Sequence, residues 1–332
     1  MYKKIRLQSF STQHFYEIEL TSSNQLQISN NSQSVYCSFK RSTNTFTLLD
    51  LEYISDEFTL IAIESIFNLF PKEAFTIIFK KSLIKQNISF NELVDNDLVI
   101  LPRDFFAKTG NIWAKKVDPT LELKEISTAG VTHPERPSYD PGELLYKKYY
   151  SEIDTTISFR VADISKDLDN FHEWHNKKFI YNFWELNKSK PELEKYLADG
   201  LKDKHSIPTI LEFNNKSIGY FEFYWAKEDR LGPFYNFSDF DRGFHFLIGE
   251  ESCLGRVNVD AILKATSHYT FLNDERTELL AGEPRSDNKR IIRYIDHFEC
   301  WRKEKEFDFP HKRAALLLCD RDTYFQEGYP WN

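Results

Sequence analysis

Hydrophobic and polar residues alternate along the first fifty positions with the period of two that is typical of half-buried strands. Turns rich in Asn and Ser interrupt the alternation. The pattern predicts strands at 3–10, 15–20, 26–30, 35–41, 45–51 and 74–80. Before the last of these, apolar residues at helical spacing follow Ser55 and two acidic residues, which predicts a helix over 55–70 with Ser55 as its N-cap.

The pattern changes near residue 155, after which strands and helices alternate. Strands are predicted at 156–163, 207–215, 217–226, 242–250, 276–283, 300–307 and 313–320. Helices are predicted across 165–201, 256–271 and 286–298. Hairpins early in the chain and alternating elements later together predict a mixed α/β (α+β) fold.

The segment 116–154 separates the two patterns. It contains four prolines, and proline lacks a backbone donor and disfavours regular structure. We therefore expect a linker over 116–154, between an N-terminal α/β domain of residues 1–115 and a C-terminal domain of residues 155–332.

Composition narrows the class of protein. The 332 residues are 41% hydrophobic and 16% aromatic, which is enough for one large core or two ordinary ones. The formal net charge of −8 provides no basic stripe for a nucleic-acid backbone. The four cysteines lie far apart, which predicts neither a zinc site nor a disulfide framework, and no apolar run approaches the roughly 18 residues of a membrane span. We expect a cytoplasmic protein that needs no metal.

A histidine in the predicted strand DRGFHFLIGE is the first candidate for chemistry. Alternation places His245, Leu247 and Gly249 on one face of the strand, so His245 can face a cleft. Taken alone, a histidine in a strand is more often a core residue bonded to a backbone carbonyl. The turn SCLGRV then leads into a helix, whose first N–H groups can bind an anion, although one glycine in a turn is by itself only a turn.

Five stretches of the C-terminal half, in the same order, are similar to one family. They are HEWHNKKFIYNFWE, GYFEFYWAKEDRLGPFY, DRGFHFLIGE, GEPRSDN and FPHKRAALLLCDRDTYF. With the order of elements over 155–332, they resemble the siderophore-biosynthesis N-acyltransferases, the group of the aerobactin, alcaligin and rhizobactin acyltransferases. The resemblance implies a GNAT fold with a mixed, splayed central sheet, and acyl-CoA as co-substrate with acetyl-CoA favoured. The smaller N-terminal domain would pack on this one, and whether it is a degenerate copy of the same fold stays open.

The resemblance assigns cofactor contacts to the splayed strand and the turn after it. Backbone N–H groups of Leu247, Ile248 and Gly249 would be unpaired and would face the pantetheine arm or the thioester oxygen. Gly255 and Arg256 occupy the place of the family's pyrophosphate loop, which is degenerate here because only Gly255 is kept.

The catalytic pair implied by the resemblance is His245 and Glu283, at the acceptor end of the cleft. Asn288 matches an asparagine that bonds the pantetheine amide. Many N-acetyltransferases have a tyrosine acid seven residues later, but this chain has Ile295 there, with Tyr294 on a different helical face. We therefore assign no tyrosine acid.

Substrate contacts are expected from four further side chains, namely His172, Trp184, Trp225 and Asp287. Asp287 by itself reads as a helix N-cap. The segment 224–235 is either an exposed hairpin loop or a loop that covers the substrate.

We expect an acyltransferase that converts an N-hydroxylated amine into a hydroxamate for a siderophore. The acceptor would be N6-hydroxylysine, N-hydroxyputrescine or N-hydroxycadaverine. Other siderophore-pathway enzymes are candidate partners, whereas neither nucleic acid nor a membrane is expected. Two alternatives stay open: an acetyltransferase of ordinary amines, such as aminoglycosides or diamines, and a non-catalytic sensor of acyl-CoA, suggested by the degenerate turn.

Overall fold

The computed structural model describes residues 3–85, 94–109, 112–119, 124–298 and 300–326. The chain divides into two compact units. Among the described residues, the first unit holds those up to Ala114 together with Lys147–Thr156, and the second holds those within Lys115–Tyr146 and Ile157–Glu327. In the described part of the chain, no helix is both long and apolar enough to cross a membrane.

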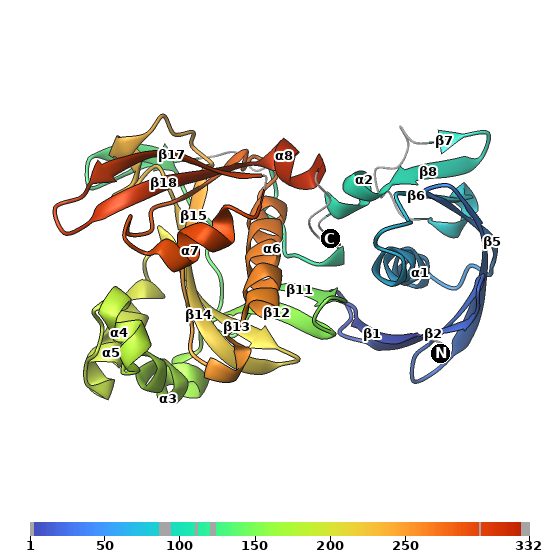
Figure 1. The fold of residues 1–332 in the computed structure, drawn as a ribbon, viewed down its shortest axis with the longest axis horizontal. Coiled ribbons are helices and arrows are strands. Elements are labelled where there is room, and N and C mark those ends of the chain that lie inside the picture. The colour runs from blue at the N-terminus through green and yellow to red at the C-terminus, as the bar shows by residue number, and fades with distance from the viewer. Residues whose placement is uncertain (1–2, 86–93, 110–111, 120–123, 299, 327–332) are drawn as a thin grey trace. The chain divides into compact units, whose positions relative to one another are not determined.

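The first sheet has eight strands in the order β1-β2-β3-β4-β5-β6-β8-β7 (Figure 1). Its strands are β1 (Lys4–Gln8), β2 (Phe15–Ser22), β3 (Gln25–Ser29), β4 (Ser34–Ser42), β5 (Thr45–Leu51), β6 (Thr76–Lys80), β7 (Val94–Asp95) and β8 (Leu98–Pro102). The first five form an antiparallel meander, and β5 then pairs parallel with β6 through the crossover helix α1 (Asp56–Leu69). The predicted N-cap is confirmed, because the Ser55 side chain accepts the Phe58 N–H at 3.3 Å. A short helix, α2 (Arg103–Ala107), follows β8.

The second sheet also has eight strands, in the order β11-β12-β13-β14-β15-β16-β18-β17. Its strands are β11 (Leu144–Tyr150), β12 (Thr155–Val161), β13 (Ser206–Phe213), β14 (Lys216–Trp225), β15 (Arg242–Ile248), β16 (Leu279–Gly282), β17 (Trp301–Asp308) and β18 (Arg313–Asp320). Its helices are α3 (Ile164–His175), α4 (Lys178–Trp184), α5 (Lys190–Gly200), α6 (Arg256–Asn273), α7 (Lys289–Ile295) and α8 (Arg321–Gln326). The pairing is antiparallel from β12 to β15, parallel between β15 and β16, and antiparallel from β16 to β18 and β17.

The two sheets share one topology. In each, an antiparallel meander ends in a strand that crosses over a helix to a parallel neighbour, and the last two strands return antiparallel. The second unit differs by an insertion, because α3, α4 and α5 lie between β12 and β13, whereas a two-residue turn joins β2 to β3. The mixed α/β architecture with a splayed sheet is confirmed, and the first unit repeats its strand order.

The segment 116–154, expected as a linker, contains regular structure. It carries the hairpin of β9 (Glu125–Thr128) and β10 (Val131–Pro134) and the whole of β11. Pro134 is the last residue of β10, and Pro137 and Pro141 lie between β10 and β11. Proline is tolerated at strand ends and between strands, so these residues delimit strands rather than prevent them.

Helices cover both faces of the second sheet. On one face, Trp174 of α3 packs in a buried cluster with Tyr220 and Leu247 of the sheet. On the other face, Tyr269 of α6 contacts Phe223 of β14 with ring centroids 4.7 Å apart. Successive residues of β14 and β15 therefore point into two different cores, as the period of two requires.

The sheet opens between β15 and β16. Their parallel pairing comprises only Arg242 with Leu280 and Gly243 with Ala281, after which the strands separate. A side chain at Gly243 would lie 2.5 Å from the Ala281 carbonyl oxygen and 2.3 Å from the Tyr224 ring, so this close approach requires glycine. The remaining five residues of β15 have a neighbouring strand on the β14 side only.

Gly249, just after β15, is expected to matter for packing. A Cβ there would lie 2.2 Å from the Trp174 indole. Gly249→Ala should therefore lower the free energy of unfolding by about 1–3 kcal/mol, the usual cost of overpacking. Denaturant unfolding followed by fluorescence measures the change. Gly282→Ala is the matched control, because its Cβ would lie 4.0 Å from Leu317, an ordinary contact; equal stability of the two variants would contradict the prediction.

Candidate active site

A cleft of about 970 Å³ lies in the second unit where β15 separates from β16. Its apolar lining comes from α6, α7 and the last two strands, with Leu254, Val259, Leu263, Ile291, Ile295, Trp301 and Leu317. Its aromatic lining comes from α4 and α5, with Phe179, Phe183, Trp184 and Tyr196. Its charged lining includes Glu222, Asp229, Arg230, His245, Glu283, Arg285 and Lys312. Such a cleft offers an apolar wall for a chain-like group and a polar wall for chemistry.

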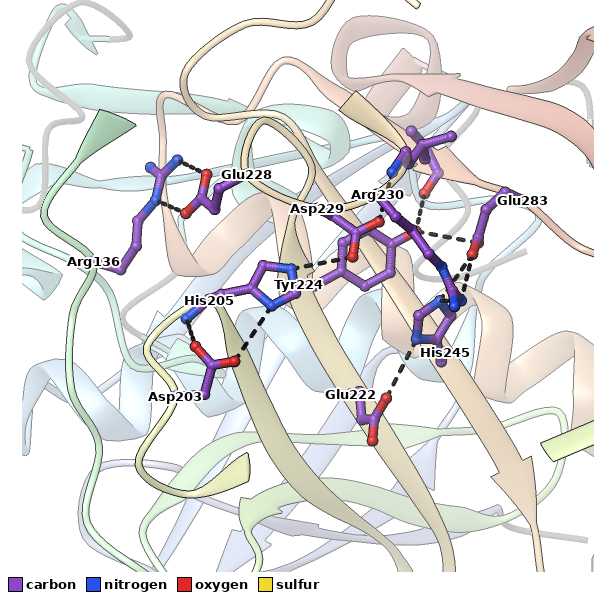
Figure 2. A network of polar contacts seen from close by, with 12 residues as sticks. Arg136, Asp203, His205, Glu222, Tyr224, Glu228, Asp229, Arg230, His245 and Glu283 are labelled. Carbon is purple, nitrogen blue, oxygen red and sulfur yellow. Dashed lines mark hydrogen bonds and ion pairs between the residues drawn. The ribbon is translucent and has the colours of Figure 1, made fainter. Parts of the chain in front are cut away.

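His245 lies between two carboxylates on the polar wall (Figure 2). Its Nδ1 is 3.3 Å from Oε2 of Glu222, and its Nε2 is 3.1 Å from Oε1 of Glu283. The Tyr224 ring packs against the imidazole, with centroids 4.8 Å apart. The side chain is 25% exposed, so a ligand in the cleft can reach the ring.

This geometry makes His245 an imidazolium. Ionised carboxylates only accept hydrogen bonds, and a neutral imidazole has only one N–H to donate. Burial by itself lowers the pKa of His245, but Glu283 and Glu222 outweigh burial and raise that pKa to about 10. His245 is therefore a proton donor at neutral pH and is not available as a base in the resting protein.

Glu222 is a site residue that the sequence did not reveal. It pairs directly opposite His245 across β14 and β15. Its Oε1 accepts hydrogen bonds from Tyr196 at 2.7 Å and Tyr220 at 3.1 Å. Burial raises the pKa of a carboxyl group, but the hydrogen bond from His245 and its charge lower the pKa of Glu222 overall. The available signal was the single acidic residue within the apolar strand SIGYFEFYWA.

Glu283, one residue beyond β16, is surrounded by cations. Its Oε1 lies 3.1 Å from Nε2 of His245, 3.1 Å from Nη2 of Arg230 and 3.4 Å from Nζ of Lys312. Its Oε2 accepts a hydrogen bond from the Tyr224 hydroxyl at 3.4 Å. Burial alone would raise the pKa of Glu283, but His245, Lys312 and Arg230 hold it far below the usual range. Arg230 and Lys312 were not assigned from the sequence, because they reach the site from the 226–241 segment and the turn before β18.

The first unit has no counterpart of this pair. His245 and Glu283 each stand two residues beyond the last parallel pair of their strands, Gly243 with Ala281. The last parallel pair of β5 and β6 is Thr47 with Ile78. Two residues further on, the first unit has Leu49 and Lys80. The repeated topology therefore does not repeat the acid–base residues.

Only one of the three backbone N–H groups expected to face the cofactor is directed at the opening. The Gly249 N–H donates to the Ile218 carbonyl at 2.8 Å, so it is already used. Hydrogen-bonded positions alternate in an antiparallel pair, so Leu247, opposite Tyr220, also turns its N–H towards β14. Ile248 lies between them, and its N–H points to the side from which β16 has departed. Of the three expected donors, Ile248 is therefore the one placed to bond a ligand in the opening, and Phe246, two residues earlier, turns its N–H to the same side.

The turn before α6 agrees only in part with the cofactor contacts expected from the sequence. Gly255 is the residue before α6, with φ +146°, and a Cβ there would meet nothing within 4 Å. Neither Gly255 nor Arg256 belongs to the cleft lining, although the adjacent Leu254 does. The Arg256 side chain is exposed and lies 3.7 Å from Asp260. Both residues flank open space at the N-terminus of α6.

The start of α7 agrees better with the expectation. Asn288 lines the cleft and caps α7, because its Oδ1 accepts the Ile291 N–H at 3.3 Å. Tyr294 and Ile295 both line the cleft, so Tyr294 does not face away as helical spacing had suggested. Asp287 is not part of the lining; it pairs with Arg285 at 3.0 Å and is exposed.

Of the other expected substrate contacts, Trp184 alone lines the cleft, where its indole N–H donates to the Phe246 carbonyl at 3.4 Å. His172 lies on α3 outside the lining. Trp225 is fully buried, with the guanidinium groups of Arg136 and Arg242 at 4.3 and 4.4 Å from its ring. We therefore assign no substrate contact to His172, Trp225 or Asp287.

Comparisons with known proteins agree with this fold. Residues 163–309 match a family model described as an acetyltransferase (GNAT) domain. An uncharacterized protein from Bacillus halodurans of known structure shares 26% identity, with a TM-score of 0.54 over 58% of this chain and 97% of that one. A Schizosaccharomyces pombe protein named as a lysine N-acyltransferase is 33% identical over 81% of this chain and 82% of its own length.

Two further relatives are named for hydroxylated amino acids. The N(6)-hydroxylysine O-acetyltransferase of Escherichia coli is 39% identical over 58% of this chain and 61% of its own length. The N(5)-hydroxyornithine:cis-anhydromevalonyl coenzyme A-N(5)-transacylase of Beauveria bassiana is 36% identical over 58% of this chain. The chain spans less than two thirds of the length of both, 61% and 43%. The protein belongs to the GNAT acyltransferase family of these hydroxylysine and hydroxyornithine acyltransferases.

The charge state of His245 can be tested directly. Its imidazole should show no titration in NMR spectra between pH 6 and pH 8.5, because its pKa is about 10. A pKa raised above the unfolded value of about 6.5 contributes stability that is complete below that pH and is lost as the pH rises towards 10. Glu222→Gln should lower the pKa of His245, since the substitution removes one of the two carboxylates that stabilise the imidazolium. A His245 that titrates near pH 6.5 in the wild type would refute the imidazolium assignment.

Proposed function

We propose that the protein transfers an acyl group from acyl-CoA, with acetyl-CoA favoured, to the nitrogen of an N-hydroxylated amine and so forms a hydroxamate. The observation that carries this proposal is the position of the His245 imidazole between the carboxylates of Glu222 and Glu283, at the opening between β15 and β16. The position suits acyl transfer, because the proton donor and the Ile248 N–H, which is turned to the opening, belong to the same strand, β15. The resemblance to siderophore-biosynthesis acyltransferases and the names of the relatives support a hydroxamate product.

The apolar wall and the N-terminus of α6 suit the donor. α6 has 18 residues, and its first N–H groups follow Gly255, where a Cβ would meet nothing within 4 Å. A helix N-terminus of this kind binds phosphate groups. The apolar wall formed by α6 and α7 is suited to the pantetheine arm, and Asn288 at the start of α7 would hold one of its amides. The Ile248 N–H would bond the thioester oxygen as negative charge develops on it.

A weakly basic nitrogen matches the protonation state of the site. A hydroxylamine nitrogen is far less basic than an alkylamine, so its lone pair is free at neutral pH without help from a base. His245 cannot act as that base while it is protonated, and an acceptor that arrives as an ammonium ion would not be activated. The geometry therefore favours orientation of a free lone pair over deprotonation of a cation.

The proton balance closes within the cluster. The nitrogen attacks the thioester carbon, the C–N bond forms, and the C–S bond then breaks to release CoA thiolate. His245 gives its proton to the thiolate, and one of its carboxylate partners accepts the proton that the nitrogen loses. Return of that proton to the imidazole restores the starting state, and no covalent acyl-enzyme is needed.

Acylation of ordinary amines is the second candidate, supported by the fold alone. An aminoglycoside or diamine would bring an ammonium group to a polar wall on which three cations, His245, Arg230 and Lys312, face the two carboxylates Glu222 and Glu283. The surplus positive charge disfavours such an acceptor. A sensor without catalysis is disfavoured by the intact proton donor.

The acceptor assignment predicts a clear preference at neutral pH. N6-hydroxylysine or an N-hydroxydiamine should be acylated much faster than lysine, putrescine or cadaverine at pH 7, because the plain amines are protonated there. CoA release measures turnover, and the coloured ferric complex identifies a hydroxamate, since acylation on nitrogen leaves the N–O oxygen and the new carbonyl free to chelate iron. Part of the difference should disappear as the pH rises. Equal turnover of plain and hydroxylated amines, or a product that does not bind Fe(III), would contradict the proposal.

The role of His245 as proton donor predicts a loss of rate without a loss of donor binding. His245→Gln should lower hydroxamate formation by roughly 10²–10⁴, the usual contribution of general acid–base catalysis, with little change in acyl-CoA affinity. Tyr294→Phe is the matched comparison, because Tyr294 also lines the cleft and is the tyrosine of α7 next to the position where many N-acetyltransferases have a tyrosine acid. A large loss in Tyr294→Phe together with near-normal turnover in His245→Gln would transfer the role to the tyrosine.

A further inference from the structure

The segment between β14 and β15 delivers Arg230 to the active site. Three consecutive residues of this segment, Glu228, Asp229 and Arg230, each form an ion pair with a different part of the second unit (Figure 2). Glu228 receives two hydrogen bonds from Arg136, at 2.6 and 2.7 Å, and both side chains are almost fully buried. Asp229 lies 3.1 Å from Nε2 of His205. These pairs fix the backbone on the N-terminal side of Arg230.

The residue after Arg230 completes the anchoring. Leu231 is fully buried in a cluster with Ala281 of β16 and Leu316 of β18. Its N–H also donates to Oδ1 of Asp229 at 2.9 Å. Arg230 is thus the one exposed side chain between two anchored neighbours, and it is 47% exposed within the cleft lining. The segment is therefore anchored on both sides of Arg230 and is not a free hairpin loop.

The guanidinium of Arg230 is only partly used. Nη2 donates to Oε1 of Glu283 at 3.1 Å and lies 3.4 Å from Nε2 of His245. In the described parts of the chain, no hydrogen bond is formed by its Nε or Nη1. Lys312 is different, because its Nζ also donates to the Glu283 carbonyl at 2.7 Å and the side chain is only 12% exposed. Arg285 lines the same cleft, but Asp287 occupies its guanidinium through Nε and Nη2, at 3.1 and 3.0 Å.

We propose that Arg230 binds the carboxylate of an amino-acid acceptor and so determines that the protein prefers an N-hydroxy amino acid to the corresponding N-hydroxydiamine. This inference rests on the proposed function. A planar guanidinium with free donors matches a carboxylate, and the surplus positive charge of the cluster is balanced when the acceptor brings one negative charge. The buried pair of Arg136 and Glu228 acts as a positioning device, since it holds the segment from which Arg230 projects.

N6-hydroxylysine and N-hydroxycadaverine provide the matched test, because they differ by the carboxylate alone. The quantity to measure is the ratio of kcat/KM for the two acceptors with acetyl-CoA. Wild type should favour hydroxylysine, and Arg230→Gln should lower the ratio by about 10 to 100-fold, the range of a hydrogen bond to a charged group, mainly through KM for hydroxylysine. If Arg230→Gln also lowers activity because the surroundings of Glu283 change, kcat/KM falls equally for both acceptors, and the ratio is unaffected.

Arg285→Gln is the control, since it removes the same charge from the same cleft. It should leave the ratio within a few-fold of wild type. The double variant Arg136→Met with Glu228→Gln removes the buried pair without leaving an unpaired charge, and it should lower the ratio in the same direction as Arg230→Gln. An unchanged ratio in Arg230→Gln, or an equal fall in Arg285→Gln, would overturn the inference. If wild type acylates neither acceptor, the proposed function itself fails.

Discussion

The early separation of β15 from β16 is the constraint on which the active site depends. Two residue pairs hold these parallel strands together, and Gly243 allows the close approach at their last contact. Beyond it, the backbone of β15 has no second partner, so the Ile248 N–H faces open space instead of a strand. The same opening lets side chains of both strands meet: His245 and Glu283, each two residues past the last pair, approach to 3.1 Å. In a fully paired sheet this space would be closed, and the Ile248 N–H would donate to the neighbouring strand.

Charge compensation decides the chemistry within that opening. A buried carboxylate is stable only with compensating partners, and Glu283 has three cations against one oxygen, whereas Glu222 has His245 and two tyrosine hydroxyls. Each carboxylate requires a donor from the imidazole, which keeps it protonated. The histidine thereby loses the ability to activate an ammonium ion and gains the ability to protonate a thiolate. A nucleophile that is already neutral at physiological pH is the acceptor with which such a site is consistent.

The two units show how the same topology can carry chemistry in one place and not in another. Both sheets contain a meander, a crossover helix and a parallel pair. The first unit has Leu49 and Lys80 at the positions of the catalytic pair, and a turn where the second unit inserts α3, α4 and α5. That insertion supplies the aromatic wall of the cleft. The opening in the sheet is shared by both units, whereas the inserted helices and the pair of His245 and Glu283 occur only in the described part of the second unit.

The sequence determined the elements and the family. Period-two alternation, a capped helix and five family-like stretches predicted the elements from residue 156 onward, made His245 and Glu283 candidates, and indicated the class of reaction, because these depend on local spacing and on residues close together in the chain. Strand β11 was missed, because it lies in the segment expected to be a linker. Tertiary structure alone decided the surroundings of that pair. Glu222 reaches His245 through strand register, and Arg230 and Lys312 reach Glu283 from segments 53 and 29 residues away. The sequence identified the histidine as a candidate; its protonation follows from two carboxylates that only folding brings to the same ring.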